Sequence, residues 1–229
     1  MEFQQRVAVV TGASSGIGAA CAEKLAERGA RVAIFARSAE RLRELAARHE
    51  GRMLAVAGDV AGEADIERLF AETEARFGAC DILINNAGMI DPKPIDATSA
   101  DDWDRMFAVN VRGAFLCARR ALRAMKAGAT IVNVASISGV PGPEKFPGWI
   151  SYCASKGALI SMTEAMAVEL KERGVRVNCV SPGAVDTKMW AEASSGAPAD
   201  MTPAEVAETI LFLASERSRP INGQNVHVW

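Results

Sequence analysis

Short apolar runs alternate along the chain with longer segments in which apolar residues recur at helical spacing. The runs cover residues 7–11, 32–36, 53–58, 82–85, 130–135 and 175–181. They are apolar at successive positions rather than at every second one, which is typical of strands covered on both faces. The pattern therefore predicts a parallel sheet, and the helical segments predict its right-handed crossovers.

Five glycines mark where helical segments end and apolar runs follow. They are Gly29, Gly51, Gly78, Gly128 and Gly174. A helix commonly ends at a residue that tolerates positive φ, and glycine does so without strain. The whole pattern predicts a Rossmann-type doubly wound α/β sandwich, with about seven mainly parallel strands and helices on both faces. No linker interrupts it, so residues 1–229 are expected to form a single domain.

Two helix starts can be located from capping residues. Thr202, Pro203 and Glu205 combine an N-cap hydroxyl, a first-turn proline and a glutamate that completes a capping box, which predicts a helix over residues 203–214. A long helix is also predicted to begin near Ser99. Its stretch 106–116 is apolar almost all round, so we expect it to pack against the sheet on one side and a second subunit on the other.

The charge balance excludes several classes of partner. Of the 229 residues, 26 are Lys or Arg and 28 are Asp or Glu, so the net charge is −2 and no nucleic-acid-binding surface is indicated. The N-terminus lacks a signal-peptide core, and the longest uncharged stretch, residues 127–143, is too polar for a membrane span. We therefore expect a soluble, cytoplasmic protein with no membrane partner.

The five cysteines show no CxxC spacing and lie scattered in apolar segments. An odd number in this arrangement argues against both a disulfide framework and a zinc site. They are interpreted as small buried thiols, and no metal site is expected.

A glycine-rich turn follows the first predicted strand and leads into a helix predicted over residues 19–28. Gly12, Gly16 and Gly18 allow a sharp turn and a close approach of the backbone to a pyrophosphate, while the helix N-terminus offers unpaired N–H groups. A turn that serves only packing is the alternative, but the position between strand and helix favours a dinucleotide site. The same turn contributes Ser14, Ser15 and Ile17.

The end of the second predicted strand bears on which nucleotide is bound. A carboxylate there would bind both ribose hydroxyls of NAD, whereas this chain has Arg37 and Ser38. A cation at a helix N-terminus is favoured when an anion is also present, and the 2′-phosphate of NADP would supply one. We therefore expect NADP to be preferred over NAD, unless Arg37 only faces water. Asp59 and Val60, after the third strand, are candidates for an adenine contact, unless Asp59 merely forms a turn.

Tyr152 and Lys156 form the strongest spacing signal in the chain. Residues four apart share one face of a helix, so the phenol and the ammonium are expected side by side, on a helix that runs to about residue 173. A neighbouring cation would lower the phenol pKa from its usual value of about 10 and make it a proton donor and acceptor near neutral pH. A packing role is the alternative for this tyrosine, the only one in the chain.

Taken together, these motifs resemble the short-chain dehydrogenase/reductase family over nearly the whole chain. The matching segments are residues 11–18, 85–88 and 181–187, together with Asn110, Ser136, Tyr152 and Lys156. The resemblance implies one dinucleotide-binding and catalytic domain. It also implies nucleotide contacts from Asn86, Ala87, Gly88, Tyr152, Lys156, Pro182, Gly183, Val185 and Thr187.

The resemblance also implies a reaction. Tyr152 would protonate a carbonyl oxygen as hydride arrives from the nicotinamide, Lys156 would hold the nicotinamide ribose and acidify the phenol, and Ser136 would bind the developing alkoxide. Asn110 would hold a water that links Lys156 to solvent. Ser138 is an alternative to Ser136, and the alternative for Asn110 is a buried polar group satisfied by backbone.

Three segments are expected to border the substrate: residues 89–98, 137–150 and 186–201. The second is longer than is usual in the family and is stiffened by three prolines, whereas the third is short, so the substrate lid looks reduced. We expect an open pocket, although residues of these types are as often ordinary packing. Its candidate walls are Met89, Val140, Phe146, Trp149, Met189 and Trp190.

Residues 221–229 resemble the family's last strand, but the sequence does not show the acidic-Gly-Gly tail that usually follows it. That tail often joins subunits. We therefore expect a homodimer, through the helices that contain Asn110 and Tyr152, more readily than a homotetramer.

These features predict an NADP-dependent oxidoreductase that interconverts a ketone or aldehyde and its alcohol. The partner is then a small-molecule carbonyl or alcohol substrate. The same residues fit a 3-oxoacyl thioester reductase, and a non-catalytic redox sensor is the alternative from another class. An aligned proton donor argues against the sensor, which has no need of one.

Overall fold

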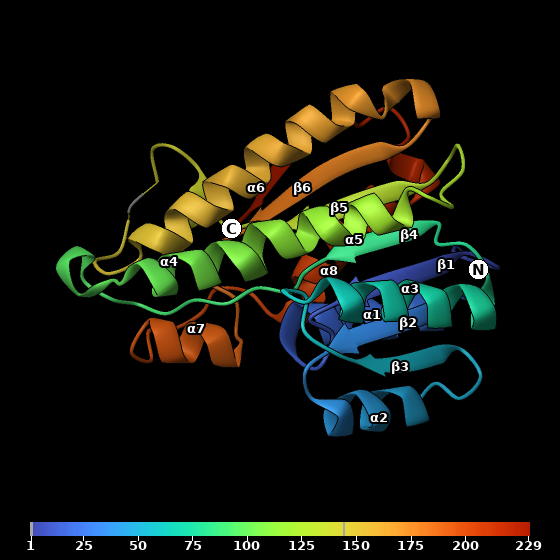
Figure 1. Ribbon diagram of the computed structural model, residues 1–229, viewed down its shortest axis with the longest axis horizontal. Coiled ribbons are helices and arrows are strands. Elements are labelled where there is room, and N and C mark those ends of the chain that lie inside the picture. The colour runs from blue at the N-terminus through green and yellow to red at the C-terminus, as the bar shows by residue number, and fades with distance from the viewer. Residues whose placement is uncertain (1, 144) are drawn as a thin grey trace.

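Seven parallel strands form the central sheet, in the spatial order β3-β2-β1-β4-β5-β6-β7 (Figure 1). The structure, a computed structural model, describes residues 2–143 and 145–229. The predicted fold class, a Rossmann-type doubly wound sandwich of about seven strands, is confirmed. The strands are β1 (Val7–Thr11), β2 (Arg31–Ala36), β3 (Met53–Ala57), β4 (Ile82–Asn85), β5 (Thr130–Val134), β6 (Arg176–Pro182) and β7 (Asn225–Val228).

The first six strands coincide with the predicted apolar runs, and their ends differ by no more than one residue. All residues of β1, β4 and β5 are buried. Helices on both faces exclude water from these strands, which explains why their sequences show no alternation of polar and apolar positions. β7 lies at the edge of the sheet and is only partly buried, so it tolerates the more polar sequence.

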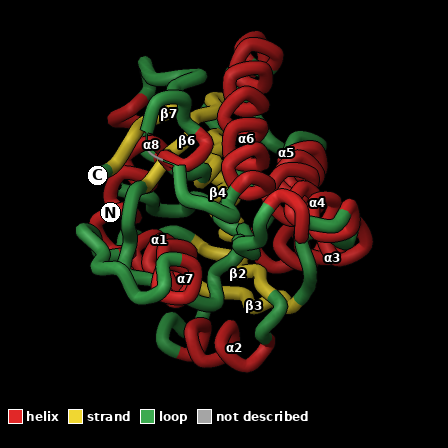
Figure 2. The backbone as a smooth tube through the Cα atoms, turned by 90° about the vertical axis from the view of Figure 1, so that its left-hand side faces the viewer, coloured by secondary structure: helices red, strands yellow, loops and turns green. Residues whose placement is uncertain are grey.

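Helices cover both faces of the sheet, as Figure 2 shows. One face is covered by α1 (Gly16–Glu27), α2 (Ala39–Ala47) and α8 (Pro203–Ala214). The other is covered by α3 (Glu63–Phe77), α5 (Gly113–Ala121) and α6 (Ile150–Glu169). The short α7 (Lys188–Ala193) lies beyond the carboxyl ends of the strands. No helix within the described residues has both the length and the apolar composition needed to cross a bilayer.

The predicted helix starts are confirmed, but the long helix after Ser99 is not uniform. Ser99 and Thr202 each form a capping box with the acidic residue three positions later, and α8 begins and ends as predicted. Between α4 (Ala100–Phe107) and α5, the segment Ala108–Arg112 forms a π-helical turn. Such turns often occur at functional sites, and this one carries Asn110.

The strand order creates a crevice at one edge of the sheet. β1 pairs with β2 on one side and with β4 on the other, so the connections from these strands leave in opposite directions. Ligands of open α/β sheets bind at such a reversal, outside the carboxyl ends of the strands. The turns that follow β1 and β4 both lie there.

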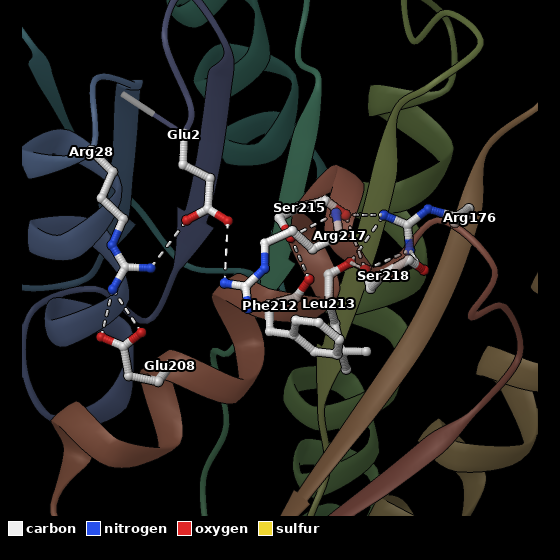
Figure 3. A network of polar contacts seen from close by, with 9 residues as sticks. All are labelled: Glu2, Arg28, Arg176, Glu208, Phe212, Leu213, Ser215, Arg217 and Ser218. Carbon is white, nitrogen blue, oxygen red and sulfur yellow. Dashed lines mark hydrogen bonds and ion pairs between the residues drawn. The ribbon is translucent and has the colours of Figure 1, made fainter.

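Arg176, at the start of β6, fixes the end of α8 (Figure 3). Its guanidinium donates hydrogen bonds to the carbonyl oxygens of Leu213 at 3.1 Å, Ser215 at 3.0 Å and Ser218 at 3.3 Å. Carbonyl groups at a helix C-terminus lack intrahelical partners, so Arg176 serves as a cap from another element. Arg217, on the same turn, forms a 3.9 Å ion pair with Glu2, and its side chain is 72% exposed.

We expect Arg176→Met to lower the free energy of unfolding by about 2–3 kcal/mol, because several carbonyl oxygens lose a charged donor. Arg217→Met is the matched control and should cost less than about 0.5 kcal/mol, because exposed ion pairs contribute little. Urea denaturation followed by circular dichroism measures both values. Equal losses in the two variants would contradict the capping role of Arg176.

Candidate active site

The crevice at the carboxyl ends of the strands is a cavity of about 1010 Å³. Loops after β1 to β6 line it, so residues far apart in the sequence meet there. Gly18 and Asn110 are predicted site residues that lie behind its lining. The other predicted site residues all line the cavity: Gly12, Ser14, Ser15, Gly16, Ile17, Arg37, Ser38, Asp59, Val60, Asn86, Ala87, Gly88, Ser136, Tyr152, Lys156, Pro182, Gly183, Val185 and Thr187.

The glycine-rich turn packs tightly against the turn that follows β4. Asn86 donates from Nδ2 to the carbonyl oxygens of Thr11 at 3.1 Å and Gly12 at 3.2 Å. Gly12 has φ +67°, and a Cβ there would lie 2.8 Å from this Nδ2 atom. A Cβ on Gly18 would lie 2.5 Å from the carbonyl oxygen of Gly12. Gly18 therefore shapes the turn by packing behind it rather than by lining the cavity.

The N-terminus of α1 opens into the cavity. Ser15 is the N-cap residue, yet its side chain makes no capping hydrogen bond, and Gly16 and Ile17 line the cavity. The N–H groups of a first helical turn lack intrahelical acceptors and lie at the positive end of the helix dipole. A Cβ on Gly16 would lie 3.1 Å from Thr187 Cγ2, so a side chain there would fill the space beside the turn. These features fit the pyrophosphate of a dinucleotide.

Arginines gather at the end of the cavity beside β2 and β3. Arg37 is exposed and lines the cavity next to Ser38. Arg41, in the first turn of α2, also lines it. Arg41 was not predicted; Arg37 precedes the N-cap Ser38, so the two arginines do not share a helix.

Asp59 is held by contacts within the protein. Its Oδ1 accepts the N–H of Ala61 at 2.9 Å, and its Oδ2 accepts a hydrogen bond from Arg105 at 2.9 Å. Burial raises the pKa of Asp59, but these hydrogen bonds outweigh burial and keep that pKa below its ordinary value. Asp59 thus forms a turn, which was the alternative prediction to an adenine contact. It also lines the cavity.

Tyr152 and Lys156 lie on one face of α6, and both line the cavity. Lys156 Nζ is 5.7 Å from the centroid of the Tyr152 ring and donates a hydrogen bond to the carbonyl oxygen of Val134 at 2.9 Å. Burial raises the pKa of Tyr152 to about 12 and lowers the pKa of Lys156 to about 8. The predicted lowering of the phenol pKa is therefore wrong for the protein alone, because burial has the larger effect.

Ser136 follows β5 and lies close enough to the phenol to affect its pKa. Burial has the largest effect on the pKa of Tyr152, but a hydrogen bond with Ser136 acts in the opposite direction and lowers that pKa. Ser136 Oγ also accepts the N–H of Ser138 at 3.1 Å, which fixes the hydroxyl in place. Ser138 lines the cavity as well, but of the two only Ser136 affects the Tyr152 pKa, which favours Ser136 over Ser138.

Asn110 is buried in the π-helical turn behind the cavity. Its Nδ2 donates to the carbonyl oxygen of Met89 at 2.9 Å and to Ser155 Oγ at 3.0 Å, and its Oδ1 accepts the N–H of Met89 at 2.8 Å. These contacts are the ones expected if Asn110 is a buried polar group satisfied mainly by backbone, which was the alternative prediction. A Cβ on Gly88 would lie 3.3 Å from Lys156 Nζ and 3.4 Å from Asn110 Oδ1. Asn110 therefore anchors the segment after β4 directly beside Lys156.

Most predicted substrate walls lie at the cavity. Val140 does not, because the turn before it packs against α6, where a Cβ on Gly139 would lie 2.5 Å from the N atom of Gly157. Glu144, in the predicted loop 137–150, lies outside the described residues. The predicted walls that line the cavity are Met89, Phe146, Trp149, Met189 and Trp190.

Further apolar residues line the cavity, among them Ile90 and Pro92, which lie in the predicted segment 89–98, and Trp229, which was not predicted. Trp229 follows β7, which reaches the site by pairing with β6. That pairing joins segments more than forty residues apart, so no local motif signals it.

Known proteins are similar to this chain over nearly its whole length. The family described as short chain dehydrogenase matches residues 6–198. The chain is 38% identical to 2-(R)-hydroxypropyl-CoM dehydrogenase from Xanthobacter autotrophicus, over 95% of this chain and 94% of that protein. It is 36% identical to meso-2,3-butanediol dehydrogenase from Serratia marcescens, over 100% of this chain and 94% of that protein.

Solved structures give the same result. A short chain dehydrogenase from Burkholderia cenocepacia in complex with NADP superposes with a TM-score of 0.91 at 35% identity, covering 100% of this chain and 98% of that chain. The match thus includes sequence, fold and nearly the full length of both chains. The chain belongs to the short chain dehydrogenase family, the NAD(P)-dependent oxidoreductases that act on CH–OH groups.

Proposed function

We propose that this protein is an NADP-dependent oxidoreductase that interconverts a ketone or aldehyde and its alcohol, with Tyr152 as general acid and base. The observation that carries the proposal is that the Tyr152 phenol, the Ser136 hydroxyl and the Lys156 ammonium share one cavity with the glycine-rich turn after β1. A proton donor is thereby placed in the same space as a dinucleotide site.

The proposed chemistry divides between the nucleotide and the protein. When bound, the reduced nicotinamide supplies a hydride to the carbonyl carbon. Ser136 donates a hydrogen bond to the carbonyl oxygen, and Tyr152 transfers its proton to that oxygen as negative charge develops on it. Hydride and proton together make the two-electron reduction to the alcohol. Lys156 lies beside the phenol ring and stabilises the phenolate that remains.

The preference for NADP rests on the cations beside β2. Arg37 and Arg41 line the cavity there, and β2 is followed by no carboxylate that would bind the ribose of NAD. A 2′-phosphate would receive forked, charge-assisted hydrogen bonds from a guanidinium. The related Burkholderia cenocepacia enzyme, solved with NADP, supports the same assignment.

We expect Tyr152→Phe to lower kcat for ketone reduction by about 10²–10⁴-fold, because the variant keeps the ring and loses the proton. The dissociation constant of NADPH should change little. Stopped-flow nucleotide oxidation and fluorescence titration measure the two quantities. Undiminished turnover in Tyr152→Phe would remove the phenol from the mechanism.

Arg37→Asp should raise the KM for NADPH by about tenfold to a hundredfold, because the charge reversal acts on the 2′-phosphate, and should not raise the KM for NADH, whose ribose hydroxyls a carboxylate can bind. Arg43→Asp is the matched control, since Arg43 is exposed on α2, which begins just after Arg37, and does not line the cavity. Steady-state kinetics with both nucleotides measures the ratio. A preference of the unaltered enzyme for NADH would overturn the assignment.

The pH profile of reduction should be level near pH 7 and fall as pH rises above the Lys156 pKa of about 8. Deprotonated Lys156 no longer stabilises the phenolate. Tyr152, with a pKa of about 12, keeps its proton throughout this range and does not limit reduction. Initial rates measured across this range test the expectation. A profile without a break near pH 8 would contradict the role of Lys156.

A further inference from the structure

The end of the cavity beside Tyr152 is built from aromatic rings. Trp149 lies edge-on to Tyr152, with ring centroids 5.7 Å apart. It also packs against Phe146 at 4.7 Å and against Trp190 at 6.3 Å. We call Phe146, Trp149 and Trp190 the ring wall, and all three line the cavity together with Tyr152.

Hydrogen bonds to the main chain hold the ring wall in place. The N–H of Lys93 donates to the carbonyl oxygen of Gly148 at 2.9 Å, which ties two substrate loops together next to Trp149. The indole N–H of Trp190 donates to the carbonyl oxygen of Ala197 at 2.8 Å. The wall is therefore preformed. A ligand that binds to it loses little free energy in ordering these side chains.

The ring wall presents apolar surface to the cavity. Phe146 is 43% exposed, whereas Trp149 beneath it is 6% exposed. Because the Trp190 N–H is already satisfied within the protein, the wall offers ring faces and edges rather than hydrogen bonds. Covering such surface contributes about 25 cal/mol per Å² of apolar area, and ring pairs gain further from their geometry.

The two lysines that line the described part of the cavity make contacts within the protein. Lys188, on α7, pairs with Glu192 at 3.5 Å, and both side chains lie mostly in solvent. Lys156 donates to Val134. The arginines that line the described part of the cavity lie at its opposite end, beside β2 and β3. A carboxylate, phosphate or polyol at the ring wall would lose hydration without gaining a matching partner.

We propose that the substrate is an uncharged ketone or secondary alcohol that carries an aryl group or a similarly flat apolar ring. The ring packs on Phe146, Trp149 and Trp190, while the carbonyl or hydroxyl oxygen meets Tyr152 and Ser136. This inference rests on the proposed function and narrows its substrate class. The reduced nucleotide supplies the hydride and Tyr152 supplies the proton, as in the proposed function. The ring-bearing ketone thereby becomes the corresponding secondary alcohol, and the nucleotide is oxidised.

Competition between matched ketones tests the inference. 1-Phenyl-2-propanone and acetone have the same methyl ketone and differ by one unconjugated phenyl ring. With NADPH, we expect kcat/KM for the phenyl ketone to exceed that for acetone at least a hundredfold, and also to exceed the values for dihydroxyacetone and acetoacetyl-CoA.

Phe146→Ala should lower the ratio of kcat/KM for 1-phenyl-2-propanone to kcat/KM for acetone at least tenfold. Phe212→Ala is the matched control, because Phe212 is similarly exposed, at 36%, but lies on α8 outside the cavity lining. The control should keep the ratio within twofold. Both rates are measured in one preparation, so any loss of folded enzyme cancels in the ratio.

The outcomes separate the two proposals. Turnover of acetoacetyl-CoA or dihydroxyacetone at least as efficient as that of the phenyl ketone overturns the aryl inference and leaves the oxidoreductase intact. A ratio that Phe146→Ala does not change overturns it as well. Failure to reduce any of the four carbonyl compounds, with NADPH still bound, overturns both.

Discussion

The site depends on one physical constraint, the burial of a phenol and an ammonium side by side on α6. Burial favours the neutral form of each group, which raises the pKa of Tyr152 to about 12 and lowers the pKa of Lys156 to about 8. A neutral phenol keeps its proton at neutral pH until an oxyanion develops next to it. In the proposed mechanism, Ser136 would hold that oxyanion beside the phenol.

The parallel sheet brings this pair to the nucleotide. The reversal of strand order at β1 and β4 opens the crevice, and α6 contributes Tyr152 and Lys156 to its lining. Gly88 passes closely beside Lys156 and Asn110, and Gly139 passes beside Gly157 at a distance that leaves no room for a side chain. The proposed nucleotide binding, proton transfer and substrate recognition would therefore use different walls of one cavity.

Local patterns in the sequence were sufficient for the strands and for α8, because apolar runs and a capping box act within a few residues. The spacing of Tyr152 and Lys156 likewise predicted that the two share a helix face. It did not reveal their burial, which depends on β5 and on the segment after β4, so the direction of the phenol pKa was wrong. Trp229 and the contacts of Asn110 depend on tertiary pairing and were not predictable from spacing.

The most direct measurement of the central claim uses the single tyrosine of this chain. Protein labelled with ¹³C at the tyrosine Cζ gives one resonance, whose shift reports the protonation of Tyr152 alone. In the free enzyme, the account predicts that this resonance stays at its phenol position well above pH 10, as the raised pKa requires. A resonance that moves to the phenolate position between pH 7 and 9 would contradict the account.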